Sequence, residues 1–113
     1  PTAQRFSQLH IDLVGPLPVA AGGFSHLLTV VDRATRWAEA VPLTSTTADA
    51  CAAALISGWI SRYGVPLQLT SDRGVQFSSA VWASLMTALG VKHVMTTAYH
   101  PQSNGLVEHS TTV

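Results

Sequence analysis

The sequence contains little cysteine, little charge and no long hydrophobic run. The single cysteine, Cys51, excludes an internal disulfide framework and a multi-cysteine zinc knuckle, and its alanine-rich surroundings predict a small buried hydrophobe. Charged residues make up 11% of the chain, which argues against disorder. The net charge is zero, so the sequence lacks the basic excess of many nucleic-acid binders. No apolar run approaches the ~18 residues of a membrane span, and the first residues lack the hydrophobic segment of a signal peptide.

The remaining composition is that of one globular domain. Hydrophobic residues account for 47% of the 113 positions, which is enough to bury a core. The chain begins with Pro1 and ends at Val113 without a clear terminator, so we expect a fragment of a longer protein. With neither a signal peptide nor a membrane span in the sequence, we expect that protein to be intracellular.

The amino-terminal part of the sequence predicts three strands. Residues 9–14 alternate, with Leu9 and Ile11 on one face and His10 and Asp12 on the other. Residues 27–31 form a second β run, and residues 36–43 are expected to pair back after a tight turn at 32–35. These segments predict a three-stranded antiparallel meander.

Helical periodicity follows the meander. A helix capped by Thr46 is expected to carry an apolar face through residues 52–63, and another is expected between Ser79 and Gly90. Strands are expected at 67–70 and 91–95, an irregular loop at 96–103, and a last helix after Asn104. All three tryptophans, at positions 37, 59 and 82, are expected in the core. The order βββαβαβα predicts an α/β fold in which the fourth and fifth strands run parallel to the first in a five-stranded mixed sheet.

Three of the six acidic residues stand in distinctive local contexts. Asp12 lies in LHIDLVGP, Asp72 in TSDRGVQF and Glu108 in SNGLVEHS, with 35 residues between the last two. A carboxylate in the middle of a strand is costly unless it has a partner, and two carboxylates on neighbouring strands repel one another unless a cation lies between them. Carboxylates gathered from distant segments therefore predict a divalent-metal site for phosphoryl transfer, with Mg²⁺ or Mn²⁺ bound by these three residues.

The chain resembles the catalytic core of retroviral and long-terminal-repeat retrotransposon integrases, the D,D-35-E type of the ribonuclease H-like superfamily. The resemblance extends from about residue 6 to residue 109. The segments that carry it are His10-Ile11-Asp12 with Gly15-Pro16, Val30-Val31-Asp32-Arg33 with Arg36-Trp37, Tyr63-Gly64-Val65-Pro66, Ser71-Asp72-Arg73-Gly74 with Gln76-Phe77, and Tyr99-His100-Pro101-Gln102 followed by Asn104-Gly105 and Glu108.

The resemblance implies a ribonuclease H-like fold and identifies Asp12, Asp72 and Glu108 as the catalytic metal ligands. It also implies 3′-end processing of a linear DNA copy, strand transfer into target DNA, and a homodimer or higher oligomer that works in the nucleus during integration. Residues 1–113 would form the catalytic core, with its carboxy-terminal part truncated and with neither the zinc-binding nor the carboxy-terminal DNA-binding domain.

Several further residues are candidates for DNA binding. They are Arg73 as a phosphate contact, His100 in the loop before the last helix, and Gln102, Asn104 and Gly105 at the start of that helix. His10 is either a supporting residue beside Asp12 or a core histidine, and Asp32 is expected to be structural. The spacing of the histidines does not predict a zinc site.

Two alternatives to integration remain open at this stage. The tail His109-Ser110-Thr111-Thr112-Val113 lacks the basic residues that the family usually has there, and together with the neutral charge this is compatible with a catalytically silent module that binds nucleic acid or dimerises. The second alternative is a ribonuclease H-like nuclease that hydrolyses the RNA strand of a hybrid.

Overall fold

Five strands form one mixed sheet in the order β3-β2-β1-β4-β5. The computed structural model describes residues 6–18 and 21–97. The strands are β1 (Gln8–Val14), β2 (His26–Asp32), β3 (Ala38–Leu43), β4 (Gln68–Ser71) and β5 (Lys92–Met95). The first three strands are antiparallel neighbours, whereas β4 runs parallel to β1 and β5 runs parallel to β4. The predicted meander and parallel pair are therefore confirmed.

One interrupted helix and one regular helix connect the strands. The first consists of α1 (Ala48–Leu55), a π-helical segment η2 (Ile56–Ile60) and α2 (Ser61–Tyr63), and the second is α3 (Ala80–Leu89). A short 3-10 turn, η1 (Ala21–Gly23), precedes β2. The last predicted helix lies outside the described residues.

The helix ends follow from their capping residues. The Thr47 side chain accepts a hydrogen bond from the backbone N–H of Ala50, so α1 begins one residue later than the predicted cap at Thr46. The Ser79 side chain caps α3 in the same way, as predicted. Gly90 ends α3 in the left-handed conformation, with φ 74°, which glycine adopts without a steric penalty.

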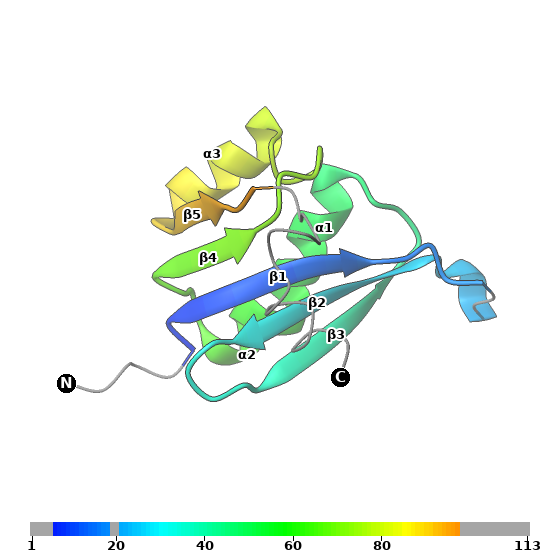
Figure 1. Cartoon of the computed structure of the whole chain (residues 1–113), viewed down its shortest axis with the longest axis horizontal. Helices are drawn as coiled ribbons and strands as arrows, with labels where there is room; N and C mark the ends of the chain where they lie inside the picture. The colour runs from blue at the N-terminus through cyan, green and yellow to red at the C-terminus, as the bar shows by residue number, and fades with distance from the viewer. Residues whose placement is uncertain (1–5, 19–20, 98–113) are drawn as a thin grey trace.

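The described helices cover one face of the sheet. In Figure 1 the sheet faces the viewer, with α1 and α2 behind it and α3 beside β5. Every second strand residue points toward the helices and is buried, including Leu9, Ile11, Leu28, Val30 and Leu69. These side chains form the core together with Cys51, Trp59, Phe77 and Trp82. The intervening strand residues, among them His10 and Asp12, belong to the opposite face, which we call the open face because no described helix covers it; on β4 this face includes the buried Thr70.

Two predictions about the core are wrong. Trp37 is 53% exposed, because the chain turns at Arg36 (φ 68°) and β3 begins only at Ala38, which leaves Trp37 at the edge of the sheet. Ile56, which falls on the predicted apolar face of the first helix, is 40% exposed, because the buried side of that helix is centred on Cys51, Leu55 and Trp59. Cys51 is buried as expected.

Membrane insertion finds no support in the described part of the chain. Neither helix combines the length and the apolar character that crossing a bilayer requires.

Candidate metal and nucleic-acid site

Asp12 and Asp72 lie at the same end of two adjacent parallel strands. The β1–β4 register pairs Gln8 with Gln68 and His10 with Thr70, and each aspartate stands two residues beyond the latter pair. Neighbouring strands are about 4.8 Å apart. Both aspartates are exposed, with Asp12 on the open face and Asp72 just past the end of β4. The topology thus brings together two of the three predicted metal ligands.

The loop after β4 holds the Asp72 carboxylate in a tight turn. Asp72 Oδ1 accepts a hydrogen bond of 2.8 Å from the backbone N–H of Gly74. A Cβ on Gly74 would lie 3.0 Å from this same oxygen and 2.8 Å from Gln76 Oε1, so the turn has little space for a larger residue. The backbone of Gly74 therefore lies close to the Asp72 carboxylate and the Gln76 side chain.

Buried polar groups fix the backbone at the start of this turn. The Ser71 hydroxyl donates to the Asp72 carbonyl oxygen and forms a second hydrogen bond with His93 Nε2, each 2.8 Å long. Burial lowers the pKa of His93, because desolvation disfavours the imidazolium. These contacts connect Asp72 to β5 and restrict where its carboxylate can lie.

Asp12 is held less tightly on its strand. Its Oδ1 accepts a hydrogen bond of 2.9 Å from the backbone N–H of Leu13, and its backbone carbonyl accepts one of 3.2 Å from the Thr29 hydroxyl on β2. The exposed carboxylate therefore keeps lone pairs available to a ligand.

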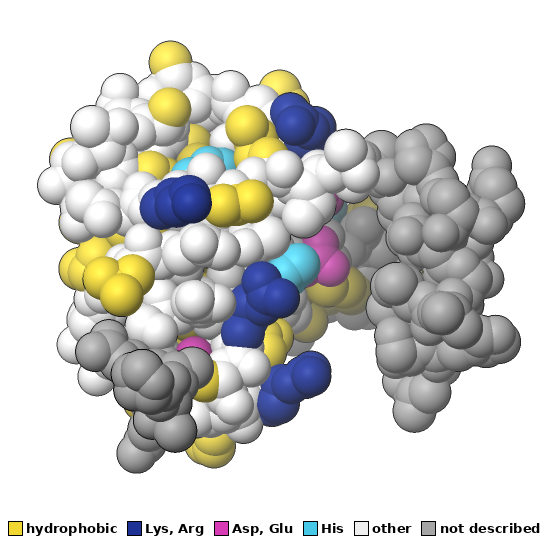
Figure 2. Space-filling view, turned by 60° about the vertical axis from the view of Figure 1, so that its left-hand side comes forward, with side chains coloured by type: hydrophobic (Ala, Val, Ile, Leu, Met, Phe, Trp, Pro, Cys, Tyr) yellow, Lys and Arg dark blue, Asp and Glu magenta, His cyan; other side chains and the backbone are white. Residues whose placement is uncertain are grey.

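His10 and Arg73 accompany the two aspartates. His10 is exposed on the open face, so its interpretation as a core histidine is wrong, and its side chain lies on the same side of β1 as Asp12. Arg73 is exposed next to Asp72 and forms no ion pair with the residues that the structure describes. Figure 2 shows basic, acidic and histidine side chains near one another on one side of the molecule.

The remaining predicted site residues lie outside the described residues. These are Glu108, His100, Gln102, Asn104 and Gly105. Within residues 6–18 and 21–97, no group of three or more histidine, cysteine or acidic side chains is arranged to hold a metal ion. The oxygen donors of Asp12 and Asp72 nevertheless suit a hard divalent cation, which prefers carboxylate ligands.

Asp32 has a structural role, as predicted. Its buried carboxylate accepts hydrogen bonds from the backbone N–H of Phe6 (3.0 Å), the backbone N–H of Thr35 (2.9 Å) and the Thr35 hydroxyl (2.6 Å). Burial alone would raise the pKa of Asp32, but these hydrogen bonds together hold it below its ordinary value. Asp32 thereby organises the β2–β3 turn and faces away from the open side of the sheet.

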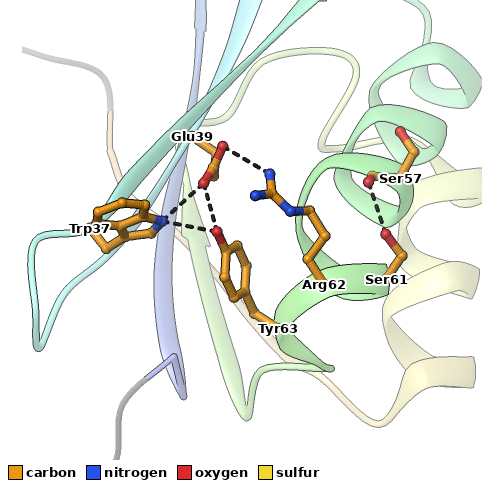
Figure 3. A network of polar contacts seen from close by, with 6 residues as sticks. All are labelled: Trp37, Glu39, Ser57, Ser61, Arg62 and Tyr63. Carbon is orange, nitrogen blue, oxygen red and sulfur yellow. Dashed lines mark hydrogen bonds and ion pairs between the residues drawn. The ribbon is translucent and has the colours of Figure 1, made fainter.

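Sequence reasoning missed a polar cluster that joins β3 to the first helix. Glu39 accepts hydrogen bonds from the Tyr63 hydroxyl (2.7 Å) and Trp37 Nε1 (2.9 Å), and it pairs with Arg62 at 3.2 Å (Figure 3). The pKa of Glu39 is lowered, first by the Tyr63 hydrogen bond and then by that of Trp37. The sequence offered one signal, because Glu39 is the only acidic residue in the predicted strand at 36–43. Its hydrogen-bond partners could not be predicted, because they depend on the tertiary fold.

Comparison with known proteins agrees with this geometry. A family model described as "Integrase core domain" matches residues 3–101. The chain is 42% identical over 86 residues to the Gag-Pol polyprotein of feline leukemia virus, and 29% identical over 105 residues to the retrovirus-related Pol polyprotein from transposon 412 of Drosophila melanogaster. These matches cover 76% and 93% of the chain but only 5% and 8% of the polyproteins.

Solved structures share the fold. The catalytic core domain of HTLV-2 integrase in complex with magnesium, in its trimeric form, superposes with a TM-score of 0.74 at 19% identity and covers 100% of this chain and 69% of that one. The dimeric form of the same domain gives a TM-score of 0.73 at 18% identity, covering 96% and 70%. At these identities the likeness establishes the ribonuclease H-like fold.

Proposed function

The chain belongs to the integrase core domain family, and from this premise we propose that it carries out divalent-metal-dependent phosphoryl transfer on DNA. The reaction would comprise 3′-processing of element DNA and its strand transfer into target DNA. In this proposal residues 1–113 form the catalytic core of a retroelement polyprotein, with Mg²⁺ or Mn²⁺ as cofactor. The observation that supports it best is the position of Asp12 and Asp72, each two residues beyond a registered pair of adjacent parallel strands.

Each proposed ligand has a defined task. Asp12 and Asp72 bind the cation from neighbouring strands, and Glu108 completes the set from a segment outside the described residues. The bound metal would supply charge stabilisation at the attacking and leaving oxygens of the phosphodiester. The Gly74 N–H orients the Asp72 carboxylate before any ligand arrives, which lowers the cost of ordering it.

Five residues are proposed to contact DNA. Arg73 neutralises a phosphate next to Asp72, since its guanidinium is exposed and forms no ion pair within the described segments. His100, Gln102, Asn104 and Gly105 are proposed to contact the DNA backbone from the segment that precedes Glu108. Action on chromosomal DNA would place the protein in the nucleus during integration.

We also propose that the chain self-associates. The related HTLV-2 domains are described as dimeric and trimeric forms, and a homo-oligomer would bring two catalytic units to the two ends of a linear DNA. Light scattering over a series of protein concentrations tests this, and a mass that stays monomeric at the highest concentration would contradict it.

Nicking of supercoiled plasmid DNA in Mg²⁺ or Mn²⁺ tests the proposed chemistry. The parent chain should nick the plasmid. In Asp72→Asn the nicking rate should fall by more than ~10–100-fold, which is the usual cost of removing a residue that only supports a metal ligand. Asp49→Asn is the matched control, since it removes one carboxylate from the first turn of α1. Equal activity of Asp72→Asn and the parent would refute the site assignment.

A labelled RNA–DNA hybrid separates integration from the alternative nuclease activity. Preference for duplex DNA over the hybrid supports the integrase proposal, whereas faster cleavage of the RNA strand favours a ribonuclease H-like nuclease. A folded parent that cleaves neither substrate and binds no metal favours the silent module.

A further inference from the structure

A row of polar and basic residues crosses the open face at the opposite end of β1 from Asp12. The register places Gln8 beside Gln68 and Gln68 beside Lys92, so these three residues share one face of β1, β4 and β5. The Arg33 backbone N–H donates a hydrogen bond of 2.9 Å to the Gln8 carbonyl oxygen, which extends the row to the end of β2. We call Lys92, Gln68, Gln8 and Arg33 the amino-end row.

The charge of the amino-end row is not neutralised by neighbouring side chains. Arg33 and Lys92 are exposed and form no ion pair with the residues that the structure describes. The nearest carboxylate along the chain, Asp32, is buried and occupied by its hydrogen bonds with Phe6 and Thr35. Figure 2 shows several basic side chains on one side of the molecule, with acidic and histidine side chains near some of them.

Arg62 provides the contrast. It belongs to α2, on the helix-bearing side of the sheet, and its guanidinium pairs with Glu39 at 3.2 Å. Arg62 therefore pairs with a carboxylate, whereas Arg33 and Lys92 form no ion pair among the described residues. This distribution provides a local positive surface that the overall composition conceals.

The dimensions of the row suit a nucleic-acid strand. Four neighbouring strand positions at about 4.8 Å spacing span about 14 Å, and the four residue steps from Gln8 to Asp12 span about 13 Å along β1. One DNA strand advances about 3.4 Å per nucleotide, so the row lies about four nucleotides from the carboxylates. Amide and cationic side chains are the usual donors to phosphate oxygens.

We propose that the amino-end row binds the phosphate backbone of the DNA substrate about four nucleotides from the site of phosphoryl transfer. The contact is independent of base sequence and of metal, because it involves Arg33 and Lys92 with the amides of Gln8 and Gln68 rather than the carboxylates. The proposal rests on DNA being the substrate, as proposed above, and it adds a second binding site on the same strand.

Salt-dependent DNA binding tests this proposal. Fluorescence anisotropy of a labelled DNA duplex would be measured over a series of salt concentrations, with EDTA present to exclude any metal contribution. Arg33→Gln and Lys92→Gln should each reduce the slope of log K against log salt by about 0.9, and the double variant by about twice that amount. Lys92→Arg should retain the parent slope, since it keeps the charge.

Arg62→Gln is the matched control, because it removes one positive charge on the helix side. It should leave the slope unchanged, while circular dichroism confirms that each variant is folded. If the slope falls equally in Arg33→Gln, Lys92→Gln and Arg62→Gln, the change follows from the net charge of the protein and the proposal is overturned. Binding by the row variants that equals the parent's, or a parent that binds no DNA, would overturn it as well.

Failure of this proposal is distinguishable from failure of the proposed activity. A parent that binds Mg²⁺ and nicks plasmid DNA, with row variants that bind DNA normally, disproves the row alone. A parent that binds DNA through the row but does not bind metal disproves the catalytic proposal alone.

Discussion

Asp12, within β1, and Asp72, just past the end of β4, each stand two residues beyond the register partners His10 and Thr70 of these parallel strands. The equivalence arises because β4 pairs directly with β1 in the sheet order, although the two strands are separated in sequence by the rest of the meander and by the first helix. The metal site proposed above uses the carboxylate oxygens of both residues, which are ligands that a hard divalent cation prefers.

The turn after β4 should respond to a single added methyl group. In Gly74→Ala the new Cβ would crowd Gln76 Oε1 and Asp72 Oδ1, so we expect the Gln76 side chain to move and the Asp72 carboxylate to shift by a few tenths of an ångström. We expect Mg²⁺ affinity to fall by roughly 10–100-fold, the usual cost of disturbing a residue that orients a ligand. Calorimetric titration measures the affinity, and the thermal midpoint shows whether the fold is retained.

Val75→Ala is the control for the Gly74 variant. Val75 is adjacent in sequence and 80% exposed, so trimming it should change neither metal affinity nor stability appreciably. Parent-like Mg²⁺ affinity in Gly74→Ala would mean that the turn does not orient Asp72.

Local sequence patterns predicted most of the sheet because they depend on few residues. Alternation identified the buried face of β1, and the capping residue Ser79 and the terminal Gly90 marked both ends of α3. The crossover connections predicted that β4 and β5 run parallel to β1, whereas the direct pairing of β4 with β1 comes from the structure. These features are determined by short-range chemistry or by topology, and the structure confirms them.

Features that depend on tertiary contacts were not predictable in the same way. The π-helical segment lies where Gly58 meets Val41 of β3, a contact that no periodic pattern encodes. Trp37 was expected in the core because tryptophan is usually buried, but the positive φ of Arg36 leaves it at the sheet edge.

The stability contributed by Glu39 should depend on pH. Its pKa in the folded protein lies below the ordinary value of 4.5, so the unfolded chain takes up the proton first as the pH falls. The contribution is therefore fully present above about pH 4.5 and is lost as the pH falls through the folded-state pKa. Tyr63→Phe removes the largest cause of the shift, and urea unfolding should show its greatest destabilisation near about pH 7 and less in acid.

Repeating the Tyr63→Phe measurement in a Glu39→Gln variant tests whether Glu39 is the group that causes the pH dependence. In a Glu39→Gln background, Tyr63→Phe should destabilise the protein by the same amount at every pH, because no carboxylate bonded to the Tyr63 hydroxyl remains to titrate. A difference between the parent and Tyr63→Phe that stays constant from neutral to acid pH would contradict this account.

Gly58→Ala should destabilise the fold although alanine is the better helix former. The added Cβ would collide with Val41 Cγ2, and β-branched valine has little rotamer freedom to give way. Overpacking costs about 1–3 kcal/mol, whereas the gain in helix propensity is about 1 kcal/mol, so a net loss is expected. Urea denaturation measures it.

The double variant Gly58→Ala/Val41→Ala separates the clash from other effects. Val41→Ala alone should be destabilising, but it should make the Gly58 substitution neutral or favourable. If Gly58→Ala costs the same with valine or alanine at position 41, the close contact is not the cause.

Some features of the candidate site were predictable from the sequence, and others depend on the fold. The motif contexts identified Asp12 and Asp72 one by one, and the parallel pairing brought them together. The role of Gly74 as donor to Asp72 emerged only from the structure, because it depends on the exact path of the turn. Glu108 lies outside the described residues, and its role as the third ligand stays a prediction.

Calorimetric titration of Mg²⁺ and Mn²⁺ into the parent chain, Asp72→Asn and Asp49→Asn tests the central claim most directly. The account predicts binding by the parent and by Asp49→Asn, with loss of binding in a folded Asp72→Asn. Equal binding by Asp72→Asn and the parent, or no binding by a folded parent, would contradict the assignment of a carboxylate metal site to Asp12 and Asp72.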